Sequence, residues 1–195
     1  MRVRAAMLWA ALLLAAVAIT LVSTQTQPNA DELRKHYPAV PANPLVDSFA
    51  IPLEALADSD LIAVVTPAGE PHATELRREG IPGVEEYRAM EVTVLRPLWG
   101  KAPGDTLLVN VPRRNDAFLY TMTKGQRYVL CLTAFDNNGQ TNWGSGREFG
   151  FYLTDDDRLV PFAASGEEFG EELTGATLRS FLRLLAWAGS PTTAP

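Results

Sequence analysis

The chain is poor in the residues that cross-link small exported domains or bind metals. Its 195 residues include one cysteine, Cys131, and two histidines, His36 and His72. A single cysteine cannot form a disulfide within the chain. Because Cys131 lies in an apolar run between Leu130 and Leu132, we expect it to be a small buried hydrophobe rather than a reactive thiol. The two histidines lie in separate polar segments, so we expect no catalytic set, no metal site and no cofactor.

An excess of positive charge is also missing. The chain has 17 basic and 23 acidic residues, which give a formal net charge of −6. Proteins that bind nucleic acids neutralise phosphates with rows of Lys and Arg, and the adjacent Arg113 and Arg114 are only a pair. We therefore expect no nucleic-acid partner. With 47% hydrophobic and 21% charged residues, the composition is that of one globular domain with accessory segments.

A long apolar run follows Arg2 and Arg4 at the start of the chain. Ala5 to Val22 spans 18 residues, of which only Thr20 is polar. The apolar part of a cleaved signal is about 7 to 15 residues long, whereas a membrane-spanning helix needs about 20. Residues 1–24 are therefore a signal peptide or a single transmembrane anchor, and we favour the anchor.

Positive charge before the anchor keeps that end in the cytoplasm, which places the domain on the other side of the membrane, or outside the cell if the signal is cleaved. The predicted contacts with lipid are Leu8, Trp9, Leu12, Leu13, Leu14, Val17 and Ile19.

Polar residues and prolines dominate residues 25–45. Proline fixes φ and disfavours helix in the residue before it, so this segment is predicted to be a tether. Asp31 to Tyr37 could form one helical turn with His36 exposed, but such a short helix is not stable alone. The predicted domain covers residues 46–189, and residues 190–195 are predicted to be a disordered tail.

Short apolar segments separated by turn residues predict that the domain is mainly β. The predicted strands cover residues 61–66, 90–94, 107–111, 128–132, 149–153 and 159–162. The strand at residues 128–132 is apolar on both faces, which predicts a central position. Gly150 predicts a bulge or a close approach of the backbone. Residues 71–84 and 137–146 are predicted to be loops.

A helix is predicted at the C-terminal end of the domain. Leu178, Phe181, Leu182 and Leu185 follow helical spacing, after Thr174 or Thr177 as the N-cap. We expect this helix to flank the strands and to close the domain.

Five short segments follow one another along the chain: DLIAVV at 60–65, VTVL at 92–95, GDTLLV at 104–109, GQRYVLCL at 125–132 and FGF at 149–151. In this order they resemble a group of exported bacterial β domains, which are similar to the barrel of the tissue inhibitors of metalloproteinases and of netrin-like modules. The resemblance covers about residues 55–165. It implies a small five- to six-stranded OB-like barrel with a C-terminal flanking helix, preceded by an N-terminal hydrophobic helix. The animal inhibitors chelate zinc through an N-terminal cysteine, which this domain lacks, so that mechanism is not carried over.

The candidate binding residues are aromatic or arginine side chains in or beside predicted loops, because such residues dominate protein interfaces. They are Trp99, Arg113, Arg114, Phe118, Tyr120 and Trp143. Trp143 is the preferred candidate, because its loop is too polar and glycine-rich to be buried. Trp99 and Tyr120 could instead be core residues that cap the ends of the barrel.

These features favour a non-catalytic extracytoplasmic interaction module that binds a protein partner. One alternative is a cell-surface hydrolase that uses Ser145, which lies between two glycines. Another is a calcium-dependent enzyme of the cell surface, with a calcium site at Asp136 or at Asp155 to Asp157. A further alternative, which follows from the resemblance, is a metalloprotease-inhibitor-like protein.

Overall fold

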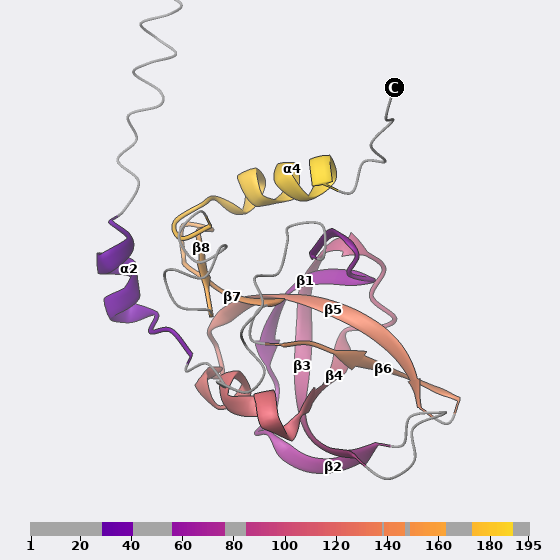
Figure 1. The fold of residues 1–195 in the computed structure, drawn as a ribbon. Helices are drawn as coiled ribbons and strands as arrows, with labels where there is room; N and C mark the ends of the chain where they lie inside the picture. The colour runs from indigo at the N-terminus through magenta and orange to yellow at the C-terminus, as the bar shows by residue number, and fades with distance from the viewer. Residues whose placement is uncertain are drawn as a thin grey trace, which may run out of the picture.

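The computed structural model describes residues 29–40, 56–76, 85–137, 139–146, 149–162 and 173–188. The described part is mainly β, with a sheet of eight strands and a C-terminal helix (Figure 1). Its elements are α2 (Ala30–His36), β1 (Leu61–Pro67), β2 (His72–Leu76), β3 (Glu85–Gly100), β4 (Thr106–Pro112), the 3-10 helix η1 (Arg113–Thr121), β5 (Arg127–Asn137), β6 (Gln140–Gly144), β7 (Gly150–Leu153), β8 (Leu159–Pro161) and α4 (Leu178–Ala188).

The predicted export segment, residues 1–24, and the predicted tail, residues 190–195, lie outside the described residues. Within the described ranges, no helix has both the length and the apolar character needed to cross a membrane.

The strand pairings of the sheet return to their starting point. β1 pairs antiparallel with both β3 and β5, β3 pairs with β4, and β5 pairs with β6. A parallel pairing between β4 and β6 completes the circuit β1-β3-β4-β6-β5-β1. β2 is added beside β3, and β7 and β8 continue the sheet from β5.

Both faces of β1 are buried because they face different cores. Leu61, Ala63 and Val65 belong to a first core with residues of β3, β4 and β5. Ile62 and Val64 belong to a second core. β5 alternates between the same two cores, and it pairs with three other strands. The predicted central position of residues 128–132 is therefore confirmed.

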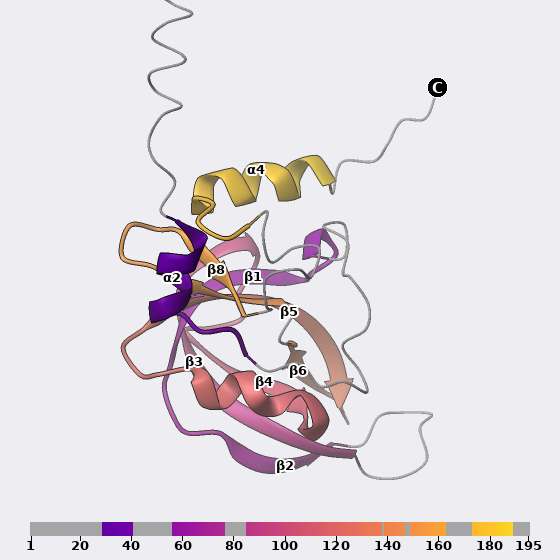
Figure 2. The ribbon, with the colours of Figure 1, turned by 60° about the vertical axis from the view of Figure 1, so that its left-hand side comes forward.

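The second core lies beneath α4, which extends across one end of the sheet (Figures 1 and 2). Leu178, Phe181 and Leu185 are the buried residues of this helix. The ring of Phe181 packs against Phe151 of β7 with 5.2 Å between the ring centroids. Thr177 Oγ1 accepts a hydrogen bond from the Ser180 backbone nitrogen at 3.2 Å, which caps the helix. The predicted C-terminal helix is confirmed.

Residues 29–40 of the predicted tether lie against the domain, with α2 beside β8 (Figure 2). Val40 is buried in the first core, and its backbone nitrogen donates to the Phe162 carbonyl oxygen at 2.8 Å. The Tyr152 hydroxyl donates to the Pro38 carbonyl oxygen at 3.1 Å. A helix as short as α2 is marginal in isolation, so these contacts with the domain stabilise it.

The strand count differs from the prediction, because β2 and β6 lie in segments that were predicted to be loops. β6 reads Gln-Thr-Asn-Trp-Gly, so its only large apolar side chain is Trp143 and no alternation is visible. The predicted fifth strand, β7, pairs with β5 and β8 and takes no part in the circuit. The predicted strand at residues 149–153 is therefore confirmed as a strand.

Candidate functional site

A groove of about 830 Å³ lies between β3 and α4. It is lined by Arg96, Pro97 and Leu98 of β3, by Asp156 and Asp157 of the turn before β8, by Thr177, and by Leu178, Arg179, Leu182, Arg183 and Ala186 of α4. Its floor is apolar and its walls carry charge. We name it the β3–α4 groove.

Two bulges in β3 form one wall of this groove. The pairing of β3 with β1 shifts register twice, leaving Leu95 and Leu98 without a partner on β1. An extra residue in one strand bends it and turns its side chains to new directions. Pro97 lies beside the second bulge and has no backbone N–H to donate. A missing backbone hydrogen bond between paired strands is tolerated at such a bulge. Leu98 packs against the second core, on which α4 also lies.

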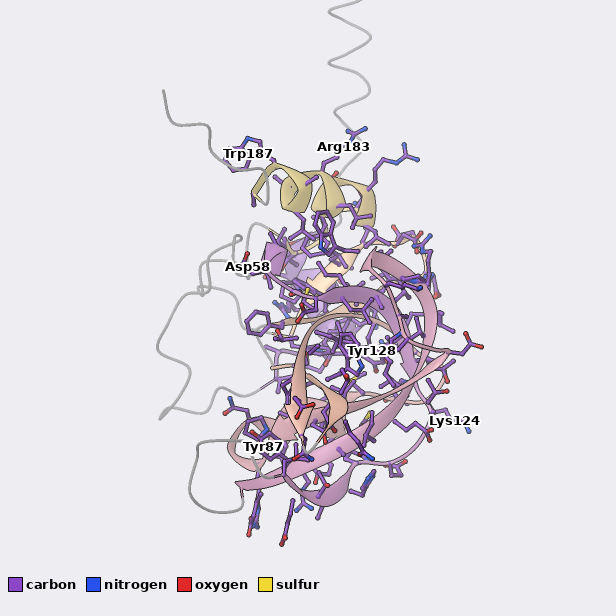
Figure 3. The ribbon with its side chains drawn as sticks, turned by 90° about the vertical axis from the view of Figure 1, so that its right-hand side faces the viewer. Asp58, Tyr87, Lys124, Tyr128, Arg183 and Trp187 are labelled. Carbon is purple, nitrogen blue, oxygen red and sulfur yellow. The ribbon has the colours of Figure 1, made fainter. Side chains whose placement is uncertain are left out.

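Among the described residues, none forms an ion pair that neutralises the positive charge of the groove. The side chains of Arg96, Arg179 and Arg183 are exposed, and none of them makes an ion pair or hydrogen bond with another described residue. Figure 3 shows Arg183 projecting from α4 away from the sheet. Arginine presents a planar fork of donors that matches a carboxylate.

The acidic residues of the groove, in contrast, already have partners. Asp156 accepts from Arg158 Nε at 2.7 Å, and Asp157 pairs with Arg127 at 3.0 Å. A hydrogen bond from the Thr154 hydroxyl, together with Arg158, lowers the pKa of Asp156. Both carboxylates therefore belong to the turn that leads into β8, and the unpaired charge among the described lining residues is positive.

Trp143 lies in the first core. Its side chain is only 8% exposed, so the prediction that it lies on an exposed loop is wrong. The residues next to it in β6 are polar or glycine because they face outward, while Trp143 alone turns inward. Phe118, another candidate, is fully buried in the same core.

Trp99 and Tyr120 are 42% and 58% exposed, so neither is a core residue that caps the sheet. Neither of them lines the β3–α4 groove. Arg113 forms an ion pair with Glu86, and its hydrogen bond lowers the pKa of that carboxyl group. Arg114 follows Arg113 in η1. Of the predicted binding residues, Arg113, Arg114 and Tyr120 thus share η1, whereas Trp143 lies in the core and Trp99 lies near the end of β3.

The thiol of Cys131 is buried, as predicted, and burial raises its pKa to about 12. Ser145 Oγ donates to the Cys131 carbonyl oxygen at 3.2 Å, which fixes the hydroxyl to the backbone of β5. Asp136 Oδ1 accepts from the Gly139 backbone nitrogen at 3.1 Å, within the β5–β6 turn. Among the described residues, no three or more His, Cys, Asp or Glu side chains form a group that could hold a metal ion.

One feature of the sequence does indicate the groove. Arg179 and Arg183 are four residues apart on the predicted helix, which places them on one face. Arg96 gave no such signal, because its position beside the helix depends on the bulges of β3. In comparisons with known proteins, no family model, no curated protein and no solved structure matched the chain.

Proposed function

We propose that this chain is a non-catalytic interaction module that binds an acidic segment of a protein partner in the β3–α4 groove. The observation that carries this proposal is a set of three arginines around an apolar floor, Arg96, Arg179 and Arg183, which pair with no other residue in the described part of the chain. Leu98 and Leu182 are partly buried there and retain apolar surface for a ligand. Arginine is one of the residue types enriched among those that supply most of the binding energy in protein interfaces.

The proposed fold of the module is a five-stranded barrel of OB type. The five strands β1, β3, β4, β6 and β5 support it, because each is paired with the next and the last is paired with the first. Barrels of this type are small, closed or partly open, and commonly bind ligands on an outer face and its loops. The order of motifs that resembles the netrin-like modules agrees with this proposal.

The proposed location is the outer side of a membrane. The apolar run from Ala5 to Val22 after Arg2 and Arg4 supports an anchor or a signal. The full-length chain should then remain in the membrane fraction after carbonate washing if it is anchored, and protease added from outside should digest the domain. A chain found intact in the cytosolic fraction would contradict this location.

The proposed binding is tested with the full-length chain in detergent and two labelled peptides of equal length. One peptide alternates glutamate with leucine, and the other alternates lysine with leucine. We expect the glutamate peptide to bind, and to bind more weakly as salt rises, because exposed charges are screened at higher ionic strength. The lysine peptide should not bind. The readout is fluorescence anisotropy.

Two double variants locate the site. Arg179→Glu with Arg183→Glu reverses the charge of the groove and should weaken binding at least tenfold. Lys101→Glu with Lys124→Glu changes the net charge of the chain equally but lies outside the groove, and it should retain binding within twofold. Lys124 lies well away from α4 (Figure 3). Equal loss in both double variants, or no binding of the glutamate peptide by the parent chain, would show that the groove is not the site.

A further inference from the structure

Two large apolar side chains on α4 remain exposed. Leu184 is 42% exposed and Trp187 is 74% exposed in the described part of the chain. They are three residues apart in the helix, which places them on one face, on neighbouring turns. Neither of them lines the β3–α4 groove. We name the surface formed by Leu184 and Trp187 the α4 outer face.

The inner face of α4 already has a partner within the domain. Its buried residues, Leu178, Phe181 and Leu185, pack in the second core. Trp187 lies on the side of the helix that is turned away from the sheet (Figure 3). One apolar face is enough for a helix to pack on a domain, so folding does not account for a second one. Exposed apolar patches with polar residues around them mark contacts with a protein or with a membrane.

The composition of α4 suits a lipid surface. Tryptophan concentrates at the boundary between lipid and water, because its ring is apolar and its N–H is polar. Arg179 and Arg183 are the charged residues of α4, and the helix itself contains no acidic residue, although the chain has a net charge of −6. Helices that lie in a membrane interface combine tryptophan and leucine with arginine, which is attracted to anionic lipids.

The position of α4 distinguishes a membrane from other partners. The apolar run of the proposed anchor ends at Val22 and the described chain begins at Asn29, so at most about 25 Å of chain separates them. α2 follows directly, and Arg34 Nη1 donates to the carbonyl oxygen of Pro161 in β8 at 2.6 Å. The segment before α4 hydrogen-bonds to Leu159 of the same short strand. α2, β8 and the start of α4 are therefore neighbours (Figure 2).

We infer that the α4 outer face docks on the lipid surface of the membrane that carries the chain, with Leu184 and Trp187 at the level of the headgroups. Arg183 projects away from the sheet as well and faces anionic headgroups there. This inference rests on the proposed location, because an anchor that ends within about 25 Å of Asn29 brings the bilayer within reach of α4.

The test uses the full-length chain, labelled with 5-fluorotryptophan, in nanodiscs of phosphatidylcholine and phosphatidylglycerol. The chain has four tryptophans, Trp9, Trp99, Trp143 and Trp187, and replacing each by phenylalanine assigns its fluorine signal. A lipid with a nitroxide near its headgroup broadens signals close to the bilayer. We expect the Trp187 signal to broaden and the signal of Trp143, which is buried in the first core, to stay sharp.

The signal of Trp9 separates this inference from the proposed location, because Trp9 lies in the predicted anchor. Broadening at Trp9 without broadening at Trp187 would support the anchor and overturn the docking of α4. Broadening at Trp187 without broadening at Trp9 would support the docking and contradict the anchor. A sharp signal from both would overturn both.

Two double variants assign the docking to particular side chains. Leu184→Ser with Trp187→Ser should reduce the nitroxide effect on the backbone amide of Ser180 in the same helix at least threefold. Leu108→Ser with Tyr120→Ser also removes an exposed leucine and an exposed aromatic ring, but outside α4, and should leave that effect unchanged. Equal effects of the two double variants would overturn the inference.

The glutamate peptide distinguishes lipid from a protein partner at the same face. The variant with Leu184→Ser and Trp187→Ser should bind this peptide as the parent chain does, because neither residue lines the β3–α4 groove. Loss of peptide binding in this variant, with an unchanged nitroxide effect at Ser180, would show that the α4 outer face contacts protein and would overturn the inference.

Discussion

The ring of Phe162 occupies the space that a side chain at position 150 would need. A Cβ placed on Gly150 would lie 2.3 Å from two carbon atoms of that ring, well inside van der Waals contact. The backbones are joined there as well, since the Phe162 nitrogen donates to the Gly150 carbonyl oxygen at 3.0 Å. Phe162 is fully buried and also packs against the rings of Tyr128 and Tyr152. Gly150 therefore lets β7 pass directly over the aromatic centre of the first core, as its place in the sequence predicted.

Gly150→Ala should destabilise the domain by about 1 to 3 kcal/mol, because the buried ring cannot move without disturbing its neighbours. The free energy of unfolding in urea measures this effect. Gly104→Ala is the matched control, since nothing lies within 4 Å of a Cβ at that position. Equal stability of the two variants would contradict the close contact between Gly150 and Phe162.

Val40→Ala should lower the free energy of unfolding by about 2 kcal/mol, because its side chain is fully buried in the first core. His36→Ala, exposed on α2, should have no measurable effect. This pair of variants tests whether residues 29–40 belong to the folded domain. If Val40→Ala left stability unchanged, the segment would behave as a free tether.

Thr154→Val should destabilise the turn before β8 by about 1 to 3 kcal/mol, since the buried hydroxyl accepts from the Arg158 nitrogen and donates to Asp156. The pKa of Asp156 should rise in the variant towards its ordinary value of 3.8, because that hydrogen bond is the main cause of its lowering. A group with a lowered pKa contributes stability above its unfolded pKa and loses it as the pH falls.

The stability difference between the parent chain and Thr154→Val should therefore shrink below about pH 3.8. An NMR titration of the Asp156 carboxyl, with Thr141→Val as an exposed threonine control, measures the pKa. An unchanged pKa would show that Thr154 does not hold the carboxylate.

Cys131 should resist alkylation by iodoacetamide at pH 8 in the folded chain and react once urea unfolds it, because the buried thiol stays protonated. The raised pKa of the thiol also makes the stability of the folded chain depend on pH. The unfolded thiol ionises around its ordinary value of 9.0 and the folded one only near 12, so its contribution is complete below pH 9 and is lost as the pH rises towards 12.

Cys131→Ala, which has no titrating thiol, supplies the reference for this loss. The stability of the parent chain should decrease more steeply than that of the variant over the same pH range. Rapid alkylation of the folded parent chain would contradict the burial of the thiol.

The sequence by itself determined the elements whose pattern is local. The alternation at Met90, Val92 and Val94 predicted a strand, and the spacing of Leu178, Phe181 and Leu185 predicted the helix that covers the second core. The apolar run at residues 128–132 predicted a strand buried on both faces. Each of these patterns follows from the periodic spacing of side chains along a single strand or helix. It can therefore be recognised without knowing which other element packs against that strand or helix.

Tertiary structure alone decided which candidate side chains lie in the core and which lie at the surface. Trp143 looked exposed because its neighbours are polar, but the pairing of β6 with both β4 and β5 turns that one side chain into the core. Arg96 became part of a groove because bulges in β3 bring it beside a helix that lies more than eighty residues later in the chain. Strand register and contacts between distant segments place these residues, and a local pattern of hydrophobicity carries no information about either.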